Sequence, residues 1–247
     1  RARQLARTDT PISGRIGTTI SAALENKSLR RRQRWYRAMR KHYPKLEKLI
    51  AVSQGVAEDV LDITGMSEAR VTVVRNPTIT PEMLASATEP VEHPWLSRDN
   101  RVPVIMGVGR LTEQKDFATL IAAFAKVRSQ QEARLIILGD GGLRSELIAQ
   151  ATALGVDEHI ALPGFQNNPW AWMSKASVFA LSSRWEGSPN TLTEAMALGI
   201  PVVSTDCPSG PRELLDAGRL APLVAMGDSD TLASALLSVL AKPSQSQ

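Results

Sequence analysis

Short apolar runs alternate with segments of helical periodicity from about residue 100 onward. The runs rich in apolar and β-branched residues lie at 102–106, 134–138, 159–163, 177–181 and 201–204. The segments with apolar residues at helical spacing lie at 117–127, 143–155 and 232–240. Apolar strands that alternate with helices predict an α/β fold, a doubly wound parallel sheet with helices on both faces. Ligands of such sheets bind at the carboxyl ends of the strands, so a site is expected in the loops there.

The first hundred residues follow this pattern less regularly. Residues 49–53 and 71–74 predict two short strands. Between them, 55–63 predicts a helix with Ser53 as its N-cap and Gly65 just past its end. Two or three strands are few for an α/β domain, so we expect the chain to begin inside one.

Proline marks the boundary between these two regions. Four prolines fall within residues 77–101, which predicts a linker. We therefore divide the chain into the last part of an N-terminal domain (1–76), the linker (77–101) and a C-terminal domain (102–247).

The charge is distributed unevenly over these parts. The chain carries a net charge of +4, but residues 1–50 hold 14 Lys and Arg against three acids, a net +11. The rest holds 15 basic and 22 acidic residues, a net −7, so the two parts present different surfaces. The single cysteine, Cys207, excludes an internal disulfide and fits a reducing compartment, and the three scattered histidines lack zinc-ligand spacing. Without an apolar run of transmembrane length, we expect a cytoplasmic protein.

The basic segment 29–48 combines this charge with an apolar stripe. Its apolar residues recur at steps of three and four: Tyr36, Met39, Tyr43 and Leu46. Pro44 should interrupt any helix there. Such a helix suits an anionic membrane surface, or it turns its apolar side to the core and leaves its charge in solvent. The charge also fits nucleic acid, but no nucleic-acid-binding module is recognisable and we expect none.

The loop GVGRLTEQK (107–115) directly follows a predicted strand. Gly109 lets the backbone approach a ligand, and Arg110 and Lys115 supply two cations that suit a diphosphate. The loop is neither a Walker loop nor a dinucleotide fingerprint, because GK[ST] is missing and Thr112 stands at the third glycine position. The alternative is a turn whose Arg and Lys are merely solvated.

Two further loops at strand ends give weaker signals. LGDGGLR (138–144) also fails as a dinucleotide fingerprint, with Arg144 at the third glycine position, and a plain turn into the helix is the favoured interpretation. In LPGFQNNPW (162–170), Gly164 and Phe165 give a bend beside an aromatic ring, which suits contact with a base. The other interpretation places Phe165 in the core or at a helix cap.

The stretch EGSPNTLTE (186–194) brackets a predicted helix start with two carboxylates. Ser188 is a good N-cap, Pro189 suits the first helical position, and the first-turn amides favour negative charge. A capping box between Thr191 and Glu194 is the alternative start.

The separation of these carboxylates argues against a glycoside hydrolase. Glycosidase carboxyls stand about 5–9 Å apart, whereas eight helical residues span about 12 Å. Glu186 and Glu194 are therefore predicted to bind different hydroxyl groups of one extended ligand, because carboxylates accept paired bonds from diols. A diphosphate with a diol at each end describes a nucleotide sugar.

These stretches together carry a family resemblance. They resemble the family-4 retaining glycosyltransferases of the GT-B fold, the group 1 type, in GVGRL…K (107–115), ILGDG (137–141), LPGF (162–165), SSRWEGSPNTLTEAMALGIPVVSTD (182–206) and PSGPREL (208–214). The likeness runs from about Leu49 to Leu240, and its strongest element is the E-x7-E pair, Glu186 and Glu194. CPSGPREL (207–214) and NPWAWM (168–173) look like the bacterial branch that builds lipopolysaccharide, capsule and other lipid-linked glycans.

The resemblance implies a role for each candidate residue. Arg110 and Lys115 would hold the donor diphosphate and, with Glu186 on the donor sugar, form the catalytic set. Glu194 would bind the ribose diol. The other implied donor-binding positions are Gly109, Gly164, Phe165, Gly187, Ser188, Pro189, Asn190 and Thr191.

The family also implies an activity. The GT-B fold has two Rossmann-like domains, of which 102–247 would be the C-terminal one. The expected reaction transfers a hexose or N-acetylhexosamine from a nucleotide sugar, UDP-linked in this branch, to a glycan or lipid-linked acceptor with retention. Neither a metal nor another cofactor is expected. The alternative is a non-catalytic nucleotide-sugar-binding module; a dinucleotide oxidoreductase is disfavoured by the two failed glycine fingerprints.

The sequence departs from the family at both ends. By the resemblance, we expect residues 1–76 to be only the last part of the family's N-terminal domain, without its Gly-rich loop and acceptor residues, and we expect no terminal helix after Pro243. We therefore expect a fragment that binds donor but transfers poorly. We expect it on the inner face of the membrane if the basic segment binds lipid.

Overall fold

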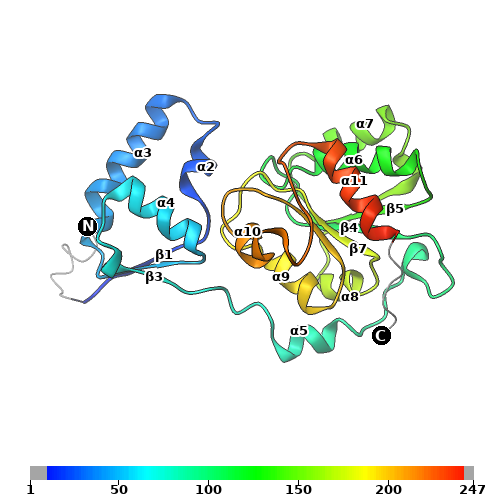
Figure 1. The fold of residues 1–247 in the computed structure, drawn as a ribbon, viewed down its shortest axis with the longest axis horizontal. Coiled ribbons are helices and arrows are strands. Elements are labelled where there is room, and N and C mark those ends of the chain that lie inside the picture. The colour runs from blue at the N-terminus through cyan, green and yellow to red at the C-terminus, as the bar shows by residue number, and fades with distance from the viewer. Residues whose placement is uncertain (1–9, 242–247) are drawn as a thin grey trace.

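Two α/β lobes joined by an extended segment make up residues 10–241, the part of the chain that the structure describes (Figure 1). The structure is a computed structural model. The expectations about residues before Thr10, and about the chain after Pro243, lie outside the described residues.

The larger lobe is built on a parallel sheet. Over the described residues it has six strands in the order β6-β5-β4-β7-β8-β9. The strands are β4 (Val104–Val108), β5 (Arg134–Leu138), β6 (Ile160–Gly164), β7 (Val178–Leu181), β8 (Val202–Thr205) and β9 (Leu223–Val224). All residues of β7 and β8 are buried, as expected for strands that are covered on both faces.

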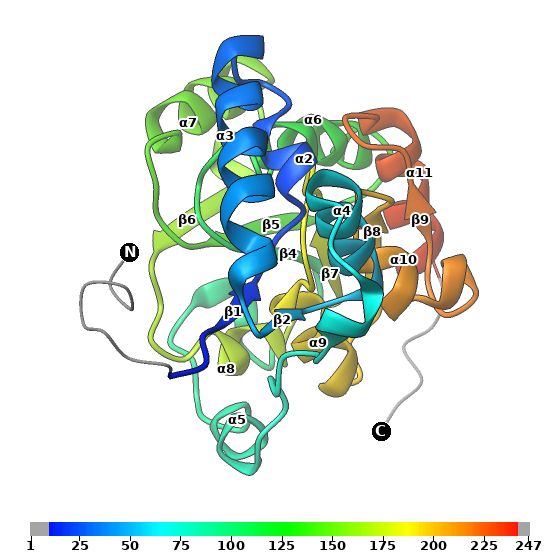
Figure 2. The same cartoon turned by 90° about the vertical axis from the view of Figure 1, so that its left-hand side faces the viewer.

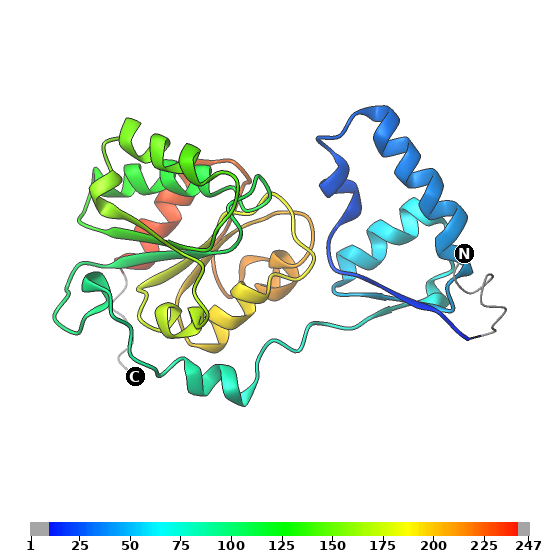
Figure 3. The ribbon, with the colours of Figure 1, turned by 180° about the vertical axis from the view of Figure 1, so that it is seen from behind.

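Helices cover both faces of this sheet (Figure 3). One face packs against α6 (Phe117–Arg128), α7 (Arg144–Ala153) and α11 (Ser229–Leu240). The other face packs against α8 (Pro169–Met173) and α9 (Asn190–Ala197), and the short helix α10 (Pro211–Leu214) follows β8. Phe124 on the first face and Leu192 on the second are fully buried. The predicted doubly wound α/β layer is therefore confirmed.

The strand order fixes where a ligand can bind. From β4 the chain builds outward through β5 and β6, and then returns to place β7 on the other side of β4. The loops after β4 and β7 therefore diverge to opposite faces and leave a crevice at the carboxyl end of the sheet. These two loops carry Arg110, Lys115 and Glu186.

The smaller lobe has a three-stranded parallel sheet within the described residues, in the order β1-β2-β3. The strands are β1 (Ser13–Ile16), β2 (Lys48–Ala51) and β3 (Val71–Val73). Three helices in this part, α2 (Ile20–Leu24), α3 (Leu29–His42) and α4 (Gln54–Thr64), lie in front of the larger lobe in Figure 2. The predicted limits of α4 are confirmed, since the Ser53 hydroxyl accepts from the Val56 amide and Gly65 ends the helix in the left-handed conformation.

The basic segment forms α3 and one following 3-10 turn, Tyr43–Lys45. Pro44 does interrupt the helix, as predicted. The apolar stripe faces the core of the small lobe, where Met39 is buried and Tyr36, Tyr43 and Leu46 pack around it. The core interpretation is thus right for this stripe. Leu29, the first residue of α3, and Trp35 have exposed side chains.

Residues 77–101 connect the two lobes and include a short helix, α5 (Pro81–Ser86). The Thr80 hydroxyl caps α5 by accepting from the Met83 amide at 3.2 Å. The segment is fastened to the larger lobe, because the Asn168 side chain donates to the Ser86 carbonyl at 2.8 Å. From α5 onward the connection is therefore fastened to the larger lobe, while the stretch before α5 runs extended between the two lobes (Figure 1).

Candidate active site at the switch point of the large sheet

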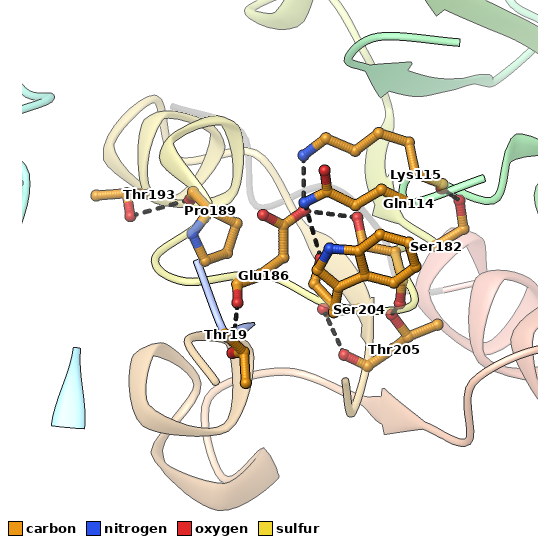
Figure 4. Close-up of polar contacts among 11 residues, drawn as sticks. Thr19, Gln114, Lys115, Ser182, Glu186, Pro189, Thr193, Ser204 and Thr205 are labelled. Atoms are coloured by element: carbon orange, nitrogen blue, oxygen red, sulfur yellow. Dashed lines mark hydrogen bonds and ion pairs between the residues drawn. The ribbon is translucent and has the colours of Figure 1, made fainter. Parts of the chain in front are cut away.

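An ion pair joins the two loops of the switch point. The Lys115 Nζ lies 2.6 Å from Oε1 of Glu186, and the two side chains are only 16% and 7% exposed. Figure 4 shows the ammonium and the carboxylate pointing toward each other. The Ser183 hydroxyl donates to the same carboxylate oxygen at 2.7 Å. Because both side chains are shielded from water, removal of either partner would leave the other charge shielded and unpaired, which destabilises a folded protein.

Backbone contacts hold the two loops in register. The Arg184 amide donates to the Gln114 carbonyl at 2.8 Å, and the Gln114 side chain donates to the Trp185 carbonyl at 3.0 Å. The Ser182 hydroxyl donates to the Lys115 carbonyl at 2.8 Å. The position of Lys115 relative to Glu186 is therefore fixed by the backbone as well as by their charges.

Gly109 and Arg110 lie beside this pair in the β4–α6 loop. The aliphatic stem of Lys115 crosses Gly109 so closely that a Cβ on Gly109 would lie 3.1 Å from the lysine Cε. Arg110 follows directly and its side chain is exposed. One partly buried and one exposed cation therefore lie in this loop, an arrangement that can neutralise a diphosphate.

The helix α9 begins later than predicted. Asn190 is its first residue, Pro189 occupies the N-cap position with extended backbone, and Ser188 makes no capping contact. The Gly210 backbone packs against the Pro189 ring and the Ser209 hydroxyl donates to the Gly187 carbonyl at 3.0 Å, so tertiary contacts fix this turn. The predicted Ser188 cap is wrong.

The capping box is also absent among the described residues, because the Thr191 hydroxyl is buried there without a hydrogen-bond partner. The first-turn amides of α9 still lie at the carboxyl end of the sheet, beside Glu186. A helix start in this place favours a negatively charged ligand.

Glu194 lies on the second turn of α9 and is half-buried. Burial raises the pKa of its carboxyl, and the nearby Trp170 indole offsets part of that rise. A carboxylate that loses water in the free protein regains hydrogen bonds when it accepts from a diol, which favours a ligand at this position.

Gly164 ends β6, and the next residue, Phe165, points into solvent. The Phe165 side chain is 74% exposed, which excludes the core interpretation. An exposed aromatic ring at the carboxyl edge of the sheet is suited to contact with a flat ligand group such as a base.

Other potential reactive groups take no part in this arrangement. Burial, with a smaller contribution from Glu186, raises the pKa of the Cys207 thiol to about 12. Cys207 therefore stays protonated near neutral pH and is unsuited to nucleophilic chemistry. Within residues 10–241, no group of three or more His, Cys, Asp and Glu side chains is arranged to hold a metal ion.

Comparison with known proteins shows the family of the chain. A family model described as "Glycosyl transferases group 1" matches residues 102–242, more than half of the chain. The chain belongs to this family. The resemblance seen in the sequence motifs is thereby confirmed.

This group 1 member is similar to bacterial proteins of glycan assembly. A Campylobacter jejuni relative, N-acetylgalactosamine-N,N'-diacetylbacillosaminyl-diphospho-undecaprenol 4-alpha-N-acetylgalactosaminyltransferase, is 32% identical over 198 residues, which cover 80% of this chain and 52% of the relative. Three of the curated relatives match most of the residues of this chain. The chain spans about half of the length of each of them.

Solved structures agree with the fold. The apo lipopolysaccharide outer core galactosyltransferase WaaB is 28% identical, with a TM-score of 0.69 over 100% of this chain and 71% of WaaB. Anabaena HepE in complex with UDP and glucose is 22% identical, with a TM-score of 0.77 over 98% of this chain and 64% of HepE. The group 1 chain therefore has the GT-B fold.

The small lobe contacts this site through residues that no sequence motif indicated. The amide and the hydroxyl of Thr19 both donate to the Glu186 carbonyl. The Asn76 side chain donates to Oδ1 of Asn190, the first residue of α9, at 2.7 Å. Both contacts join residues more than a hundred positions apart, so local sequence patterns cannot reveal them.

A second set of contacts joins the lobes at the start of α4. The Glu213 carboxylate of α10 accepts from the backbone amides of Gln54 at 3.1 Å and Gly55 at 3.0 Å. The Ser53 and Ser209 hydroxyls also form a hydrogen bond. The carboxylate thus lies where the dipole of α4 favours negative charge.

Proposed function

We propose that this group 1 chain binds a UDP-sugar and forms the donor side of a retaining glycosyltransferase. The carrying observation is the shielded Lys115–Glu186 pair at the switch point of the sheet, next to the start of α9. The proposed donor is a UDP-linked hexose or N-acetylhexosamine. HepE, whose solved complex holds UDP and glucose, supports a UDP-linked donor for this fold.

The proposed donor spans the loops of the switch point. Lys115 and Arg110 hold the diphosphate, with the first-turn amides of α9 beside it. Glu186 accepts hydrogen bonds from the sugar and Glu194 from the ribose diol. Phe165 and Gly164 lie at the base. The residues between the two carboxylates, Gly187 to Thr191, then line the turn along which the donor lies.

The proposed chemistry is substitution at the anomeric carbon with retention. An acceptor hydroxyl attacks from the face on which UDP departs, so the new C–O bond forms as the C–O bond to phosphate breaks. The acceptor proton passes to the departing phosphate. Lys115 and Arg110 stabilise the charge that develops on this phosphate, the preorganised electrostatic effect that dominates many enzymes. The proposal assigns this task to side chains and requires no bound metal.

The proposed acceptor is a glycan or a lipid-linked glycan, used at the inner face of the membrane. The Campylobacter relative supports it, because its name specifies a diphospho-undecaprenol acceptor. Arg30, Arg31 and Arg34 lie on the face of α3 that also exposes Trp35, which suits an anionic bilayer surface. Within the described part of the chain, no helix combines the length and apolarity needed to cross a bilayer.

We expect thermal denaturation with a panel of UDP-, GDP- and ADP-sugars to test the donor proposal. A UDP-sugar at 100 times its Kd should stabilise the protein by about 2.7 kcal/mol and raise its Tm by several degrees. The other nucleotide sugars should shift the Tm less. Equal shifts with all three bases, or none at all, would contradict the proposal. Binding without transfer to a lipid-linked acceptor would favour the non-catalytic module.

We expect liposome flotation to show recovery that rises with anionic lipid and falls with added salt, because the surface charge of α3 is screened. A double change, Arg31→Glu with Arg34→Glu, should abolish recovery. Arg219→Glu, an exposed charge reversal on the larger lobe, serves as the control and should preserve it. Recovery that is independent of anionic lipid would reject the membrane role.

A further inference from the structure

The Glu186 carbonyl receives two hydrogen bonds from one residue of the other lobe. The Thr19 amide donates to it at 3.0 Å and the Thr19 hydroxyl at 2.7 Å. The hydroxyl also lies 3.3 Å from the Pro208 carbonyl. Thr19 is 5% exposed, and Figure 4 shows it directly beneath the Glu186 main chain, on the side away from Lys115. Water therefore cannot replace the hydroxyl easily.

The rest of Glu186 is held by its own lobe. Lys115 and Ser183 donate to the carboxylate, and the Glu186 amide donates to the Pro208 carbonyl at 3.2 Å. None of these contacts involves the carbonyl of the peptide that joins Glu186 to Gly187. Thr19 accounts for both hydrogen bonds to its carbonyl within the described residues.

The main chains of the two lobes meet closely at this peptide. Thr18 and Gly187 form an isolated antiparallel bridge. A Cβ on Gly187 would overlap the Gly17 carbonyl oxygen and lie 2.7 Å from the Gly17 carbonyl carbon. Only glycine allows this approach, so the position of the Glu186–Gly187 peptide depends on how the small lobe sits against it.

We infer that Thr19 is a positioning residue for Glu186. Its hydroxyl fixes the peptide after Glu186, and the backbone then directs the carboxylate toward Lys115 and the sugar end of the crevice. Thr19 thereby acts on the sugar-binding geometry of the large lobe through the position of Glu186. This inference rests on the proposed function, in which Glu186 contacts the donor sugar.

Thr19→Val tests the inference because it removes the hydroxyl and keeps the shape and the amide. Calorimetry gives two Kd values, one for UDP and one for the UDP-sugar that binds the wild type best. The measured quantity is the Kd of UDP divided by the Kd of the UDP-sugar. We expect this ratio to fall about tenfold, and the Kd of UDP to change less than twofold, because a displaced carboxylate loses the sugar contact alone. Thr19→Ser, which restores the hydroxyl, should recover the ratio to within about threefold.

Thr18→Val is the matched control. The Thr18 hydroxyl, one residue away at the same interface, is buried without a hydrogen-bond partner among the described residues. Its loss should leave the ratio and the Tm unchanged or raise the Tm slightly. A Thr19→Val protein with the wild-type ratio would overturn the inference. So would a ratio that Thr19→Ser fails to restore, or an equal loss of UDP and UDP-sugar affinity.

Amide hydrogen exchange provides a second readout that needs no ligand. In Thr19→Val, the Glu186 amide should exchange about tenfold faster, because the loop opens more often, while Thr18→Val should match the wild type. Unchanged exchange would overturn the inference by itself. If the wild type bound no UDP-sugar while Thr19→Val still showed faster exchange of the Glu186 amide, the proposed function would be wrong. The positioning role of Thr19 would remain.

Discussion

Glu186→Gln is expected to remove the affinity that the sugar adds to UDP. The amide oxygen of glutamine still accepts from Lys115, whose Nζ lies 2.6 Å from the present carboxylate, so the loop stays in place. What disappears is the negative charge that accepts from sugar hydroxyls. Charge-assisted hydrogen bonds contribute about 1.5–3 kcal/mol, so UDP-sugar affinity should fall about 10- to 100-fold in calorimetry. UDP affinity should hold or rise, because the phosphates then face less negative charge. In a protein that catalyses transfer, turnover should fall about 100-fold or more.

Glu194→Gln is the matched comparison for this experiment. It makes the same chemical change on the second turn of α9, at the proposed ribose end. UDP and UDP-sugar should then lose affinity by the same factor, because both contain the ribose. If Glu186→Gln weakened UDP as much as UDP-sugar, the two ends of the donor would have been assigned wrongly. If neither change altered binding, the donor would lie elsewhere.

The larger lobe was predictable because its strands are apolar on both faces. Runs such as RLIIL (134–138) became strands with those limits, since only a strand covered on both sides needs an unbroken apolar run. The smaller lobe was harder. β1, with the sequence SGRI, has weak strand propensity and forms through its pairing with β2, a contact more than thirty residues away.

The candidate site was predictable in its residue types and less so in its geometry. The spacing of Glu186 and Glu194 indicated a ligand clamp, and the strand-end position of Lys115 placed it at the same edge. The partnership of Lys115 with Glu186, and the contacts of Ser183 and Thr19 with Glu186, depend on tertiary packing. The helix start at Asn190 was missed for the same reason, because the Gly210 and Ser209 contacts decide it.

The loop LGDGGLR illustrates a motif whose role is internal to the protein. The sequence favoured a plain turn there, and the structure gives the glycines a specific task. Gly139 has φ +132°, and a Cβ on it would overlap the Gly109 carbonyl oxygen and lie 2.9 Å from the Gly109 carbonyl carbon. The Leu111 amide also donates to the Asp140 carbonyl at 2.9 Å. This loop therefore supports the neighbouring one that carries Arg110 and Lys115.

Gly139→Ala is accordingly expected to damage both stability and donor binding. The new methyl group meets backbone atoms, which cannot swing away as a flexible side chain would, and the backbone angle is itself unfavourable for alanine. We expect the free energy of unfolding to fall by about 2–4 kcal/mol in urea denaturation. UDP affinity should fall at least tenfold, because relief of the overlap displaces the loop of Arg110 and Lys115.

Gly142→Ala gives the control within the same loop, because a Cβ there meets nothing within 4 Å and its backbone angle is ordinary for alanine. It should change the free energy of unfolding by about 0.5 kcal/mol or less and leave UDP affinity intact. Similar stability and affinity in the two variants would mean that the two loops do not pack against each other. Loss of stability without loss of UDP affinity would show that the glycines support the fold while the cations bind independently of them. The pair of variants therefore separates the packing of this loop from its effect on the donor site.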